Sequence, residues 1–360
     1  MGYAPAPYDD PAHAGASRQG GYMPPDEPIH PGPTNPTLAR ATASEVSIDG
    51  KPLGFLNLLL LHAGISPFRH LEVKTSSRDG LAGCRLRVSV SPPVAAPAVV
   101  DLPRDSQGGA VEPPALTPDY EAFYALDEAK RGQIDLALLY ENHSLAERTF
   151  LVTIQNPNEW ISLEGIEASL AGIVTPSAPA VVDVLSSLPG DFEGYQRGSR
   201  ERVIEQAEAV YEGIRRLGLA YNGIPPSFEG TGQKVLFPDE LLARRKGCCI
   251  DIATLTAALL ESISLHPVIV AVNGHAFSGV YTELMHARAP VLRDAKVVLD
   301  LIEEGSLLVW NSTTYFDRQG DDSFSAAIDM GKQHLAAFRY VLDIAACRKH
   351  GYKPVTRRSA

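Results

Sequence analysis

The pattern of apolar and polar positions divides the chain near residue 160. From about Ala43 to Trp160, the apolar residues form short β-type runs separated by turns. In CRLRVSV and in part of RTFLVTI they alternate with polar residues at a period of two, which indicates strands with one buried face. Because no long helical segment separates these runs, we predict an antiparallel β-sandwich domain over residues 43–160. Its candidate strands are SEVSIDG, FLNLLLLHAG, FRHLEVKTSS, CRLRVSVSPP, QIDLALLYEN and ERTFLVTIQN.

Helical periodicity replaces this pattern after Trp160. RERVIEQAEAVYEGIRRLG carries apolar residues at intervals of three to four, as an amphipathic helix does. PDELLARRKG begins with Pro238, which favours a helix start, and IDIATLTAALLESI is apolar enough for a buried helix. LEGIEASLAGIV and VVDVLSSL also favour helices. We therefore predict an α+β domain over residues 161–356, with strands in HPVIVAVNG, HAFSGVYTE and SLLVWNSTTYF and a terminal helix in QHLAAFRYVLDIAACRKHG.

The first 40 residues differ from both parts. They are rich in Pro, Gly, Ala and Asp and have almost no aliphatic residues. Such a segment cannot bury enough apolar surface to offset the entropy lost on ordering, so we expect a disordered tail over residues 1–40. The rest of the 360-residue chain is long enough for two domains of ordinary size.

Charge and hydropathy exclude several classes of function. The formal net charge of -11 disfavours a non-specific nucleic-acid binder, since such proteins need a basic face. The most apolar run, GFLNLLLLHAG, is too short to span a bilayer as a helix, and the N-terminus has no recognisable secretion signal. We expect a cytoplasmic protein that binds neither nucleic acid by itself nor a membrane.

The cysteines are not arranged as a metal site or a disulfide framework. Cys84, Cys248, Cys249 and Cys347 form no CxxC pair and no cysteine–histidine cluster with zinc-ligand spacing. We therefore predict no metal and no other cofactor. The neighbours Cys248 and Cys249 would pair with each other only under strain, and this usage is typical of a reducing compartment.

Cys249 stands at a position that can activate a thiol. Gly247 permits a tight entry into the apolar helix, which places Cys249 in the first turn. There the thiol meets unsatisfied backbone N–H groups and the positive end of the helix dipole, and both favour the thiolate. With an imidazolium nearby, the pKa of a cysteine falls from about 8.5 to roughly 3.5–7.5. The alternative is a small buried hydrophobic residue, the usual fate of a free cysteine.

His275 is the candidate base, because it begins the strand HAFSGVY directly after a turn and can face a helix N-terminus. A buried core histidine is the alternative interpretation, and His286 is a weaker rival. The site also needs a group that accepts the other ring N–H. Asn311, at the polar end of SLLVWN, can do so through its carbonyl or can simply end the strand. Charged alternatives on a solvated helix are Asp300, Glu303 and Glu304.

Several separate stretches between about Glu159 and Thr314 occur in an order that is specific for one family. They are NEWISLEGIEASLAGIVTPSAPAV, FEGYQRGS, YNGIPPSFEGTGQKV, FPDELLARRKGCCIDIATLTAALLE, LHPVIVAVNGHAFSGVY and LLVWNSTT. Through them the C-terminal half resembles a bacterial transglutaminase-like cysteine peptidase domain with a papain-like α+β fold. It is similar to the members that an immunoglobulin-like β-sandwich precedes, often at the N-terminus of larger helicase- or nuclease-containing proteins.

The resemblance implies roles for individual residues. By it, Cys249 is the nucleophile, His275 the base and Asn311 the third member of the triad. Gln233, in GTGQKV, either donates an amide to an oxyanion or pins its loop. The chain departs from the family at two positions: Cys248 replaces a threonine or serine, which opens the way to oxidation or to a different nucleophile, and Asn311 replaces an acidic residue.

The function that we expect is cysteine-dependent acyl transfer through a thioester, in a peptidase or amidase that acts on a protein or peptide. If an amine replaced water, the same site would be a cross-linking transglutaminase. A catalytically idle adaptor is the alternative from another class, with the sandwich or the degenerate pocket binding a protein partner. A role in bacterial defence or stress rests on analogy with related proteins. The loop from Phe228 to Val235 is expected to cover the cleft.

Overall fold

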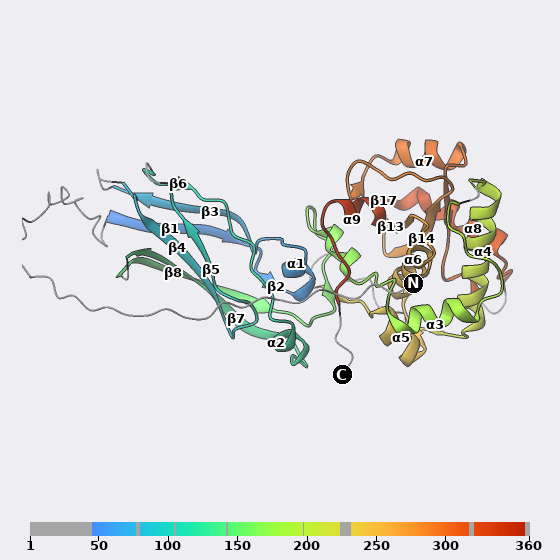
Figure 1. Cartoon of the computed structure of the whole chain (residues 1–360), viewed down its shortest axis with the longest axis horizontal. Helices are drawn as coiled ribbons and strands as arrows, with labels where there is room; N and C mark the ends of the chain where they lie inside the picture. Colours follow the sequence, from blue (N-terminus) through green and yellow to red (C-terminus); the bar gives the residue numbers. More distant parts are fainter. Residues whose placement is uncertain are drawn as a thin grey trace, which may run out of the picture. The chain divides into compact units, whose positions relative to one another are not determined.

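The computed structural model describes residues 45–76, 80–103, 106–141, 143–196, 198–223, 232–316 and 320–356 (Figure 1). The tail expected over residues 1–40 lies outside them, as does the first half of the predicted covering loop, residues 228–231. From Arg40 onward the chain forms one compact unit.

Two β-sheets form the N-terminal part. A three-stranded sheet has the order β1-β3-β6, and a five-stranded sheet has the order β2-β8-β7-β4-β5. In β4 every second residue is buried, as the period-two pattern predicts. The rings of Phe68 and Phe150, one from each sheet, meet edge to face with centroids 5.5 Å apart. The bounds are β1 Val46–Pro52, β2 Phe55–Leu56, β3 Phe68–Thr75, β4 Cys84–Ser91, β5 Ala98–Asp101, β6 Gly109–Ala110, β7 Lys130–Tyr140 and β8 His143–Ile154, with helix α2 at Tyr120–Tyr124.

The prediction of one strand over FLNLLLLHAG is wrong, and the antiparallel pattern is broken there. Only β2 is extended, and it pairs in parallel with the end of β8; helix α1 (Leu58–His62) follows at once. Asn57 causes the switch, because its Oδ1 accepts the Leu60 N–H at 2.8 Å and so caps the helix. Its Nδ2 donates to Gln155, the residue after β8, at 3.0 Å, which ties together the exits of the two strands.

The C-terminal part is built on a five-stranded antiparallel sheet of order β15-β17-β13-β14-β16. Helix α6 packs on β13 and β14, and helix α7 packs on β16 and β17 (Figure 1). Alternate residues of the sheet enter two hydrophobic clusters, so both faces are buried. The strands are β13 Pro267–Val272, β14 His275–Tyr281, β15 Val291–Leu292, β16 Leu307–Trp310 and β17 Phe338–Asp343.

The helices follow the apolar periodicity closely. The strongest amphipathic stretch forms α4 over Arg200–Arg216, and Pro238 is the first residue of α5, as predicted. Two short strand pairs connect the segments between helices: β10, after α4, pairs with β12, after α5, and β9 pairs with β11, before α5. The other elements are β9 Glu159–Trp160, η2 Glu167–Gly172, α3 Pro179–Ser187, β10 Ala220–Tyr221, β11 Gln233–Lys234, α5 Pro238–Arg244, β12 Lys246–Gly247, α6 Cys249–Ser262, α7 Ala295–Glu303, η3 Thr314–Phe316, α8 Phe324–His334, η4 Leu335–Ala337 and α9 Ile344–Lys349.

The single terminal helix predicted for residues 333–351 is wrong. Its first residues end α8, its middle forms β17, and only its last part forms α9. FRYVLD is rich in aromatic and branched residues, and it fills the gap between β13 and β15 with antiparallel pairs. Tertiary pairing therefore outweighed local helical spacing.

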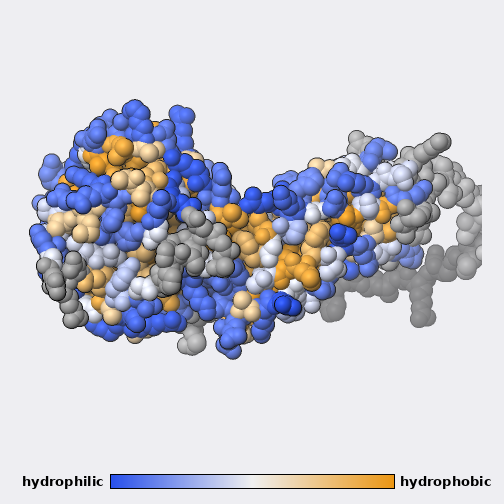
Figure 2. Space-filling view, turned by 180° about the vertical axis from the view of Figure 1, so that it is seen from behind, coloured by the Kyte–Doolittle hydropathy of each residue, from blue (hydrophilic) through white to orange (hydrophobic). Residues whose placement is uncertain are grey.

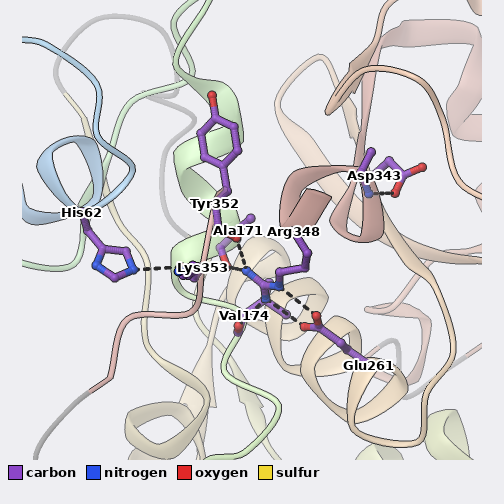
Figure 3. A network of polar contacts seen from close by, with 9 residues as sticks. His62, Ala171, Val174, Glu261, Asp343, Arg348, Tyr352 and Lys353 are labelled. Carbon is purple, nitrogen blue, oxygen red and sulfur yellow. Dashed lines mark hydrogen bonds and ion pairs between the residues drawn. The ribbon is translucent and has the colours of Figure 1, made fainter. Parts of the chain in front are cut away.

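Arg348 anchors the far end of α6 (Figure 3). Its guanidinium donates to both carboxylate oxygens of Glu261 at 2.8 Å. The same group donates to the carbonyls of Ala171, Val174 and Tyr352, each at 2.8 Å. A planar guanidinium can donate to all of these acceptors at once, so Arg348 links α9 to the end of α6 and to the η2 region.

Gly331 lets α8 lie directly on β16. A Cβ at this position would be 2.8 Å from Trp310 Cα and 3.1 Å from the backbone nitrogen of Asn311. We expect Gly331→Ala to lower the free energy of unfolding by about 1–3 kcal/mol, because backbone atoms cannot yield as a side chain can. Thermal and urea denaturation measure this. Ser325→Ala, at an exposed site of the same helix, is the control, and an equal effect of both changes would contradict the close-packing explanation.

Candidate active site

The start of α6 is fixed by its neighbours. Cys248 is the N-cap, and its backbone N–H donates to Asp251 Oδ2 at 2.8 Å, while Leu236 N–H donates to Asp251 Oδ1 at 2.7 Å. A Cβ on Gly247 would be 3.1 Å from the Asp251 carboxylate and closer still to Leu241. Glycine is therefore required at the approach, and Cys249 becomes the first residue of the helix.

The structure brings together the three residues predicted as a triad. His275, half-buried at the start of β14, lies within hydrogen-bond reach of the Cys249 side chain. Its Nε2 is 3.0 Å from Asn311 Oδ1. Thr313 N–H and Oγ1 also donate to Oδ1, at 3.2 and 2.9 Å, which identifies that atom as the oxygen. Nε2 must then donate its proton to Asn311, so Nδ1 is the ring nitrogen left for the thiol.

The surroundings of Cys249 favour the thiolate. A hydrogen bond from the Cys248 thiol lowers the pKa of Cys249 most; burial opposes it, and His275 and the Ala276 N–H lower the pKa further, to about 4. Cys248 itself has a raised pKa because of its hydrogen bond to Cys249 and its burial, so it stays a neutral donor. The side chain of Cys249 is only 5% exposed, but polar groups surround its sulfur.

The imidazole is biased toward its charged form. Burial lowers the pKa of His275, but the hydrogen bond to Cys249, the thiolate charge and the hydrogen bond to Asn311 outweigh it, so the pKa is raised overall. A thiolate–imidazolium pair is the state that these two shifts favour at neutral pH.

Gln233 lies beside the thiols but does not face an open oxyanion site. It is buried in β11, and its Nε2 donates to Cys248 Sγ at 3.3 Å. This contact pins Gln233 to the N-cap residue of α6, which is closer to the loop-pinning interpretation than to the oxyanion interpretation.

The rival residues are engaged elsewhere. His286 contacts the Ala287 carbonyl and Lys349. Asp300 and Glu303 lie on α7, where Asp300 accepts from Lys296 at 2.6 Å, and Glu304 ends that helix, its carbonyl accepting from Arg200. None of these contacts involves His275.

Two residues near the thiol were missed in the sequence. The Tyr221 side chain is close enough to the side chain and backbone of Cys249 for both to affect its pKa, and the centroid of the His334 ring lies 5.0 Å from that of the His275 ring. Burial and the charge of His275 lower the pKa of His334. Tyr221 begins the family-matching stretch YNGIPPSFEGTGQKV, but the prolines and glycines there indicate only a connection, and His334 lies outside the matching stretches.

The two sides of the site differ in how much open space they contain. A cavity of about 20 Å³ beside His275, lined by Ile250, Ala276 and Tyr340 among others, has room for about one water molecule. Tyr221, by contrast, covers Cys249 and is 42% exposed. Among the described residues, the side of Tyr221 is therefore the more exposed of the two. Across the described ranges, no group of three or more His, Cys, Asp or Glu side chains is placed to hold a metal ion.

Comparison with known families gives one match. Residues 200–300 match the family model of a transglutaminase-like domain. The matched range contains Gln233, Cys249 and His275 and ends before Asn311. No curated protein matches the sequence. In the part of the chain that the structure describes, no helix is both long and apolar enough to cross a membrane.

Iodoacetamide tests the thiolate. At about pH 5.5 we expect it to label Cys249 before Cys84 and Cys347, whose pKa values burial raises, because only the thiolate reacts. The labelling rate should rise through a pKa near the value of about 4 that the contacts give Cys249.

His275→Ala should move that titration to higher pH, since it removes the imidazolium. Mass spectrometry of the labelled peptides measures both effects. His70→Ala, a change on the exposed face of β3, is the control. Equal labelling of all cysteines at this pH would count against an activated thiol.

Proposed function

We propose that the protein is a cysteine-dependent acyl-transfer enzyme, a peptidase or amidase that works through a thioester. One observation supports this above all: at the head of a buried helix, Cys249 lies within reach of His275, whose other ring nitrogen is hydrogen-bonded to Asn311. The match to a transglutaminase-like domain agrees with cysteine-based acyl transfer. An idle adaptor would have no need of a thiolate surrounded by donors.

Acylation begins with attack of the Cys249 thiolate on a carbonyl carbon. A sulfur lone pair forms the S–C bond, and the C=O π pair moves to the oxygen. The Cys249 N–H, at the helix N-terminus, donates to that oxyanion. When the C=O bond re-forms, the C–N bond breaks, and His275 gives its Nδ1 proton to the leaving amine.

Deacylation repeats these steps with water. Neutral His275 accepts a proton from water at Nδ1, the hydroxyl attacks the thioester, and the C–S bond breaks to release a carboxylic acid and the thiolate. Asn311 keeps the imidazole in one orientation through both stages, because Thr313 fixes its carbonyl oxygen. An amine in place of water would give a cross-linked product; no contact of the site favours that outcome.

The N-terminal sheets are proposed to form an immunoglobulin-like sandwich that binds a protein substrate or partner. Their five-stranded sheet exposes Val99 at 54% and Leu151 at 82%, on β5 and β8. Figure 2 shows apolar areas within the hydrophilic surface of one face. Contiguous apolar areas on a protein surface are typical of contact surfaces.

A peptide library and an electrophilic peptide test the proposal. We expect the protein to cleave members of the library and to be captured covalently at Cys249 by a peptide that carries a thiol-directed electrophile. Cys249→Ala should abolish both, and His275→Ala should slow cleavage at least about 10³-fold. Cys248→Ser keeps a hydroxyl donor and should retain capture. If the unaltered protein neither cleaved a peptide nor was captured, the result would favour the catalytically idle adaptor.

The pKa values of Cys249 and His275 set the pH range of activity, and Asn311 affects its alkaline limb. The ion pair exists above the pKa of Cys249, about 4, and below the raised pKa of His275, so cleavage should follow a bell-shaped profile between them. Asn311→Asp places a negative charge at Nε2 and should move the alkaline limb to higher pH. Asn311→Ala should leave the ring unoriented and lower kcat/KM by roughly 10². An unchanged alkaline limb in Asn311→Asp would contradict the assigned contact.

A further inference from the structure

Tyr221 is held over the thiol by backbone pairing. Strand β10 runs parallel to β12, and Tyr221 lies opposite Gly247, two residues before Cys249. The pair is closed by two hydrogen bonds of 2.8 Å, from Ala220 N–H to the Arg245 carbonyl and from Asn222 N–H to the Gly247 carbonyl. The position of the phenol relative to Cys249 is thus built into the sheet rather than left to a loop.

The Tyr221 hydroxyl makes two contacts with one residue. Both the side chain and the backbone of Cys249 are close enough to the hydroxyl to shift its pKa. Toward a thiolate the O–H donates, and from the backbone N–H the phenolic oxygen accepts. The hydroxyl is therefore near both the atom that attacks and the N–H that must hold the oxyanion.

The ring is supported on one side and open on another. Its centroid is 5.2 Å from that of Phe316, while the residue remains 42% exposed. The exposed side of the ring leaves the phenol room to turn outward as a substrate enters. Burial and the neighbouring thiols raise the pKa of Tyr221 to about 12, so the hydroxyl keeps its proton at neutral pH.

We infer that Tyr221 is a catalytic residue whose O–H first hydrogen-bonds the Cys249 thiolate and then donates to the oxyanion of the tetrahedral intermediate. The inference rests on the proposed acyl-transfer function. The negative charge moves from sulfur to the carbonyl oxygen during attack, and the phenol follows it. No proton leaves Tyr221: the S–C bond forms, the C=O π pair moves to oxygen, and both reverse when the intermediate collapses.

This assignment gives the oxyanion a second donor that Gln233 does not supply. The Gln233 amide is committed to Cys248 Sγ at 3.3 Å. The incoming carbonyl oxygen takes the place of the phenolic oxygen on the Cys249 N–H, and the displaced phenol donates to it from the solvent side. Two donors, one from the helix N-terminus and one from β10, then share the charge.

Two reactions of the same thiol separate this role from others. p-Nitrophenyl acetate acylates a cysteine through an oxyanion, whereas iodoacetamide alkylates it by displacement at a saturated carbon, with no oxyanion. Tyr221→Phe keeps the ring on Phe316 and removes only the hydroxyl. We expect this variant to be acylated about 10²-fold more slowly, with alkylation changed by no more than about twofold.

The other outcomes overturn the inference in distinguishable ways. Unchanged acylation in Tyr221→Phe would remove the oxyanion role and leave the proposed function intact. If acylation and alkylation both became slower to the same extent, Tyr221 would stabilise the thiolate instead. If both became faster to the same extent, Tyr221 would only shield the sulfur. An unaltered protein that is alkylated but not acylated would overturn the proposed function as well.

Tyr352→Phe is the matched control, since this tyrosine lies beside Arg348 (Figure 3), which binds Glu261 at the opposite end of α6 from Cys249. It should leave both rates unchanged. Thermal denaturation of the two variants shows whether each is folded before rates are compared.

Discussion

The candidate site depends on how the first turn of α6 is held. Asp251, buried within that turn, accepts the N–H groups of Cys248 and Leu236, and Gly247 leaves room for its carboxylate. Burial raises the pKa of Asp251, while these donors oppose the shift. At the other end of the helix, Glu261 is held by Arg348. A helix fixed at both ends can present one thiol to one imidazole with little freedom, as catalysis requires.

The thiolate is stabilised by many weak donors rather than by one strong charge. Cys248, His275 and the Ala276 N–H each lower the pKa of Cys249, and Tyr221 lies over the sulfur. Burial would raise the same pKa, so the donors must outweigh desolvation. This explains how a sulfur that is almost fully buried can remain anionic. Its reactivity then depends on how readily one of these donors moves with the charge.

Local patterns predicted the elements where sequence and tertiary structure agree. Helix α4 and strand β4 show their periods plainly, and Pro238 marks the start of α5. The failures lie where a tertiary contact competes with local pattern. β17 was read as helix because its pairing with β13 and β15 depends on residues more than 40 positions away. α1 is a different case: its apolar run resembles a buried strand, and a local contact, the cap by Asn57, decides for the helix.

For the site, the sequence alone determined which groups were available: a thiol at a helix start, a histidine after a turn and a polar residue at a strand end. The position of a cysteine at a helix start and the presence of possible partners are local properties, so they can be recognised in the sequence. Tertiary structure decided that Asn311 Oδ1 faces His275, that Gln233 turns to Cys248 and that Tyr221 lies over Cys249. These contacts join residues 15 to 36 positions apart in the chain. Hydrophobic periodicity describes only neighbouring residues, so it cannot predict them.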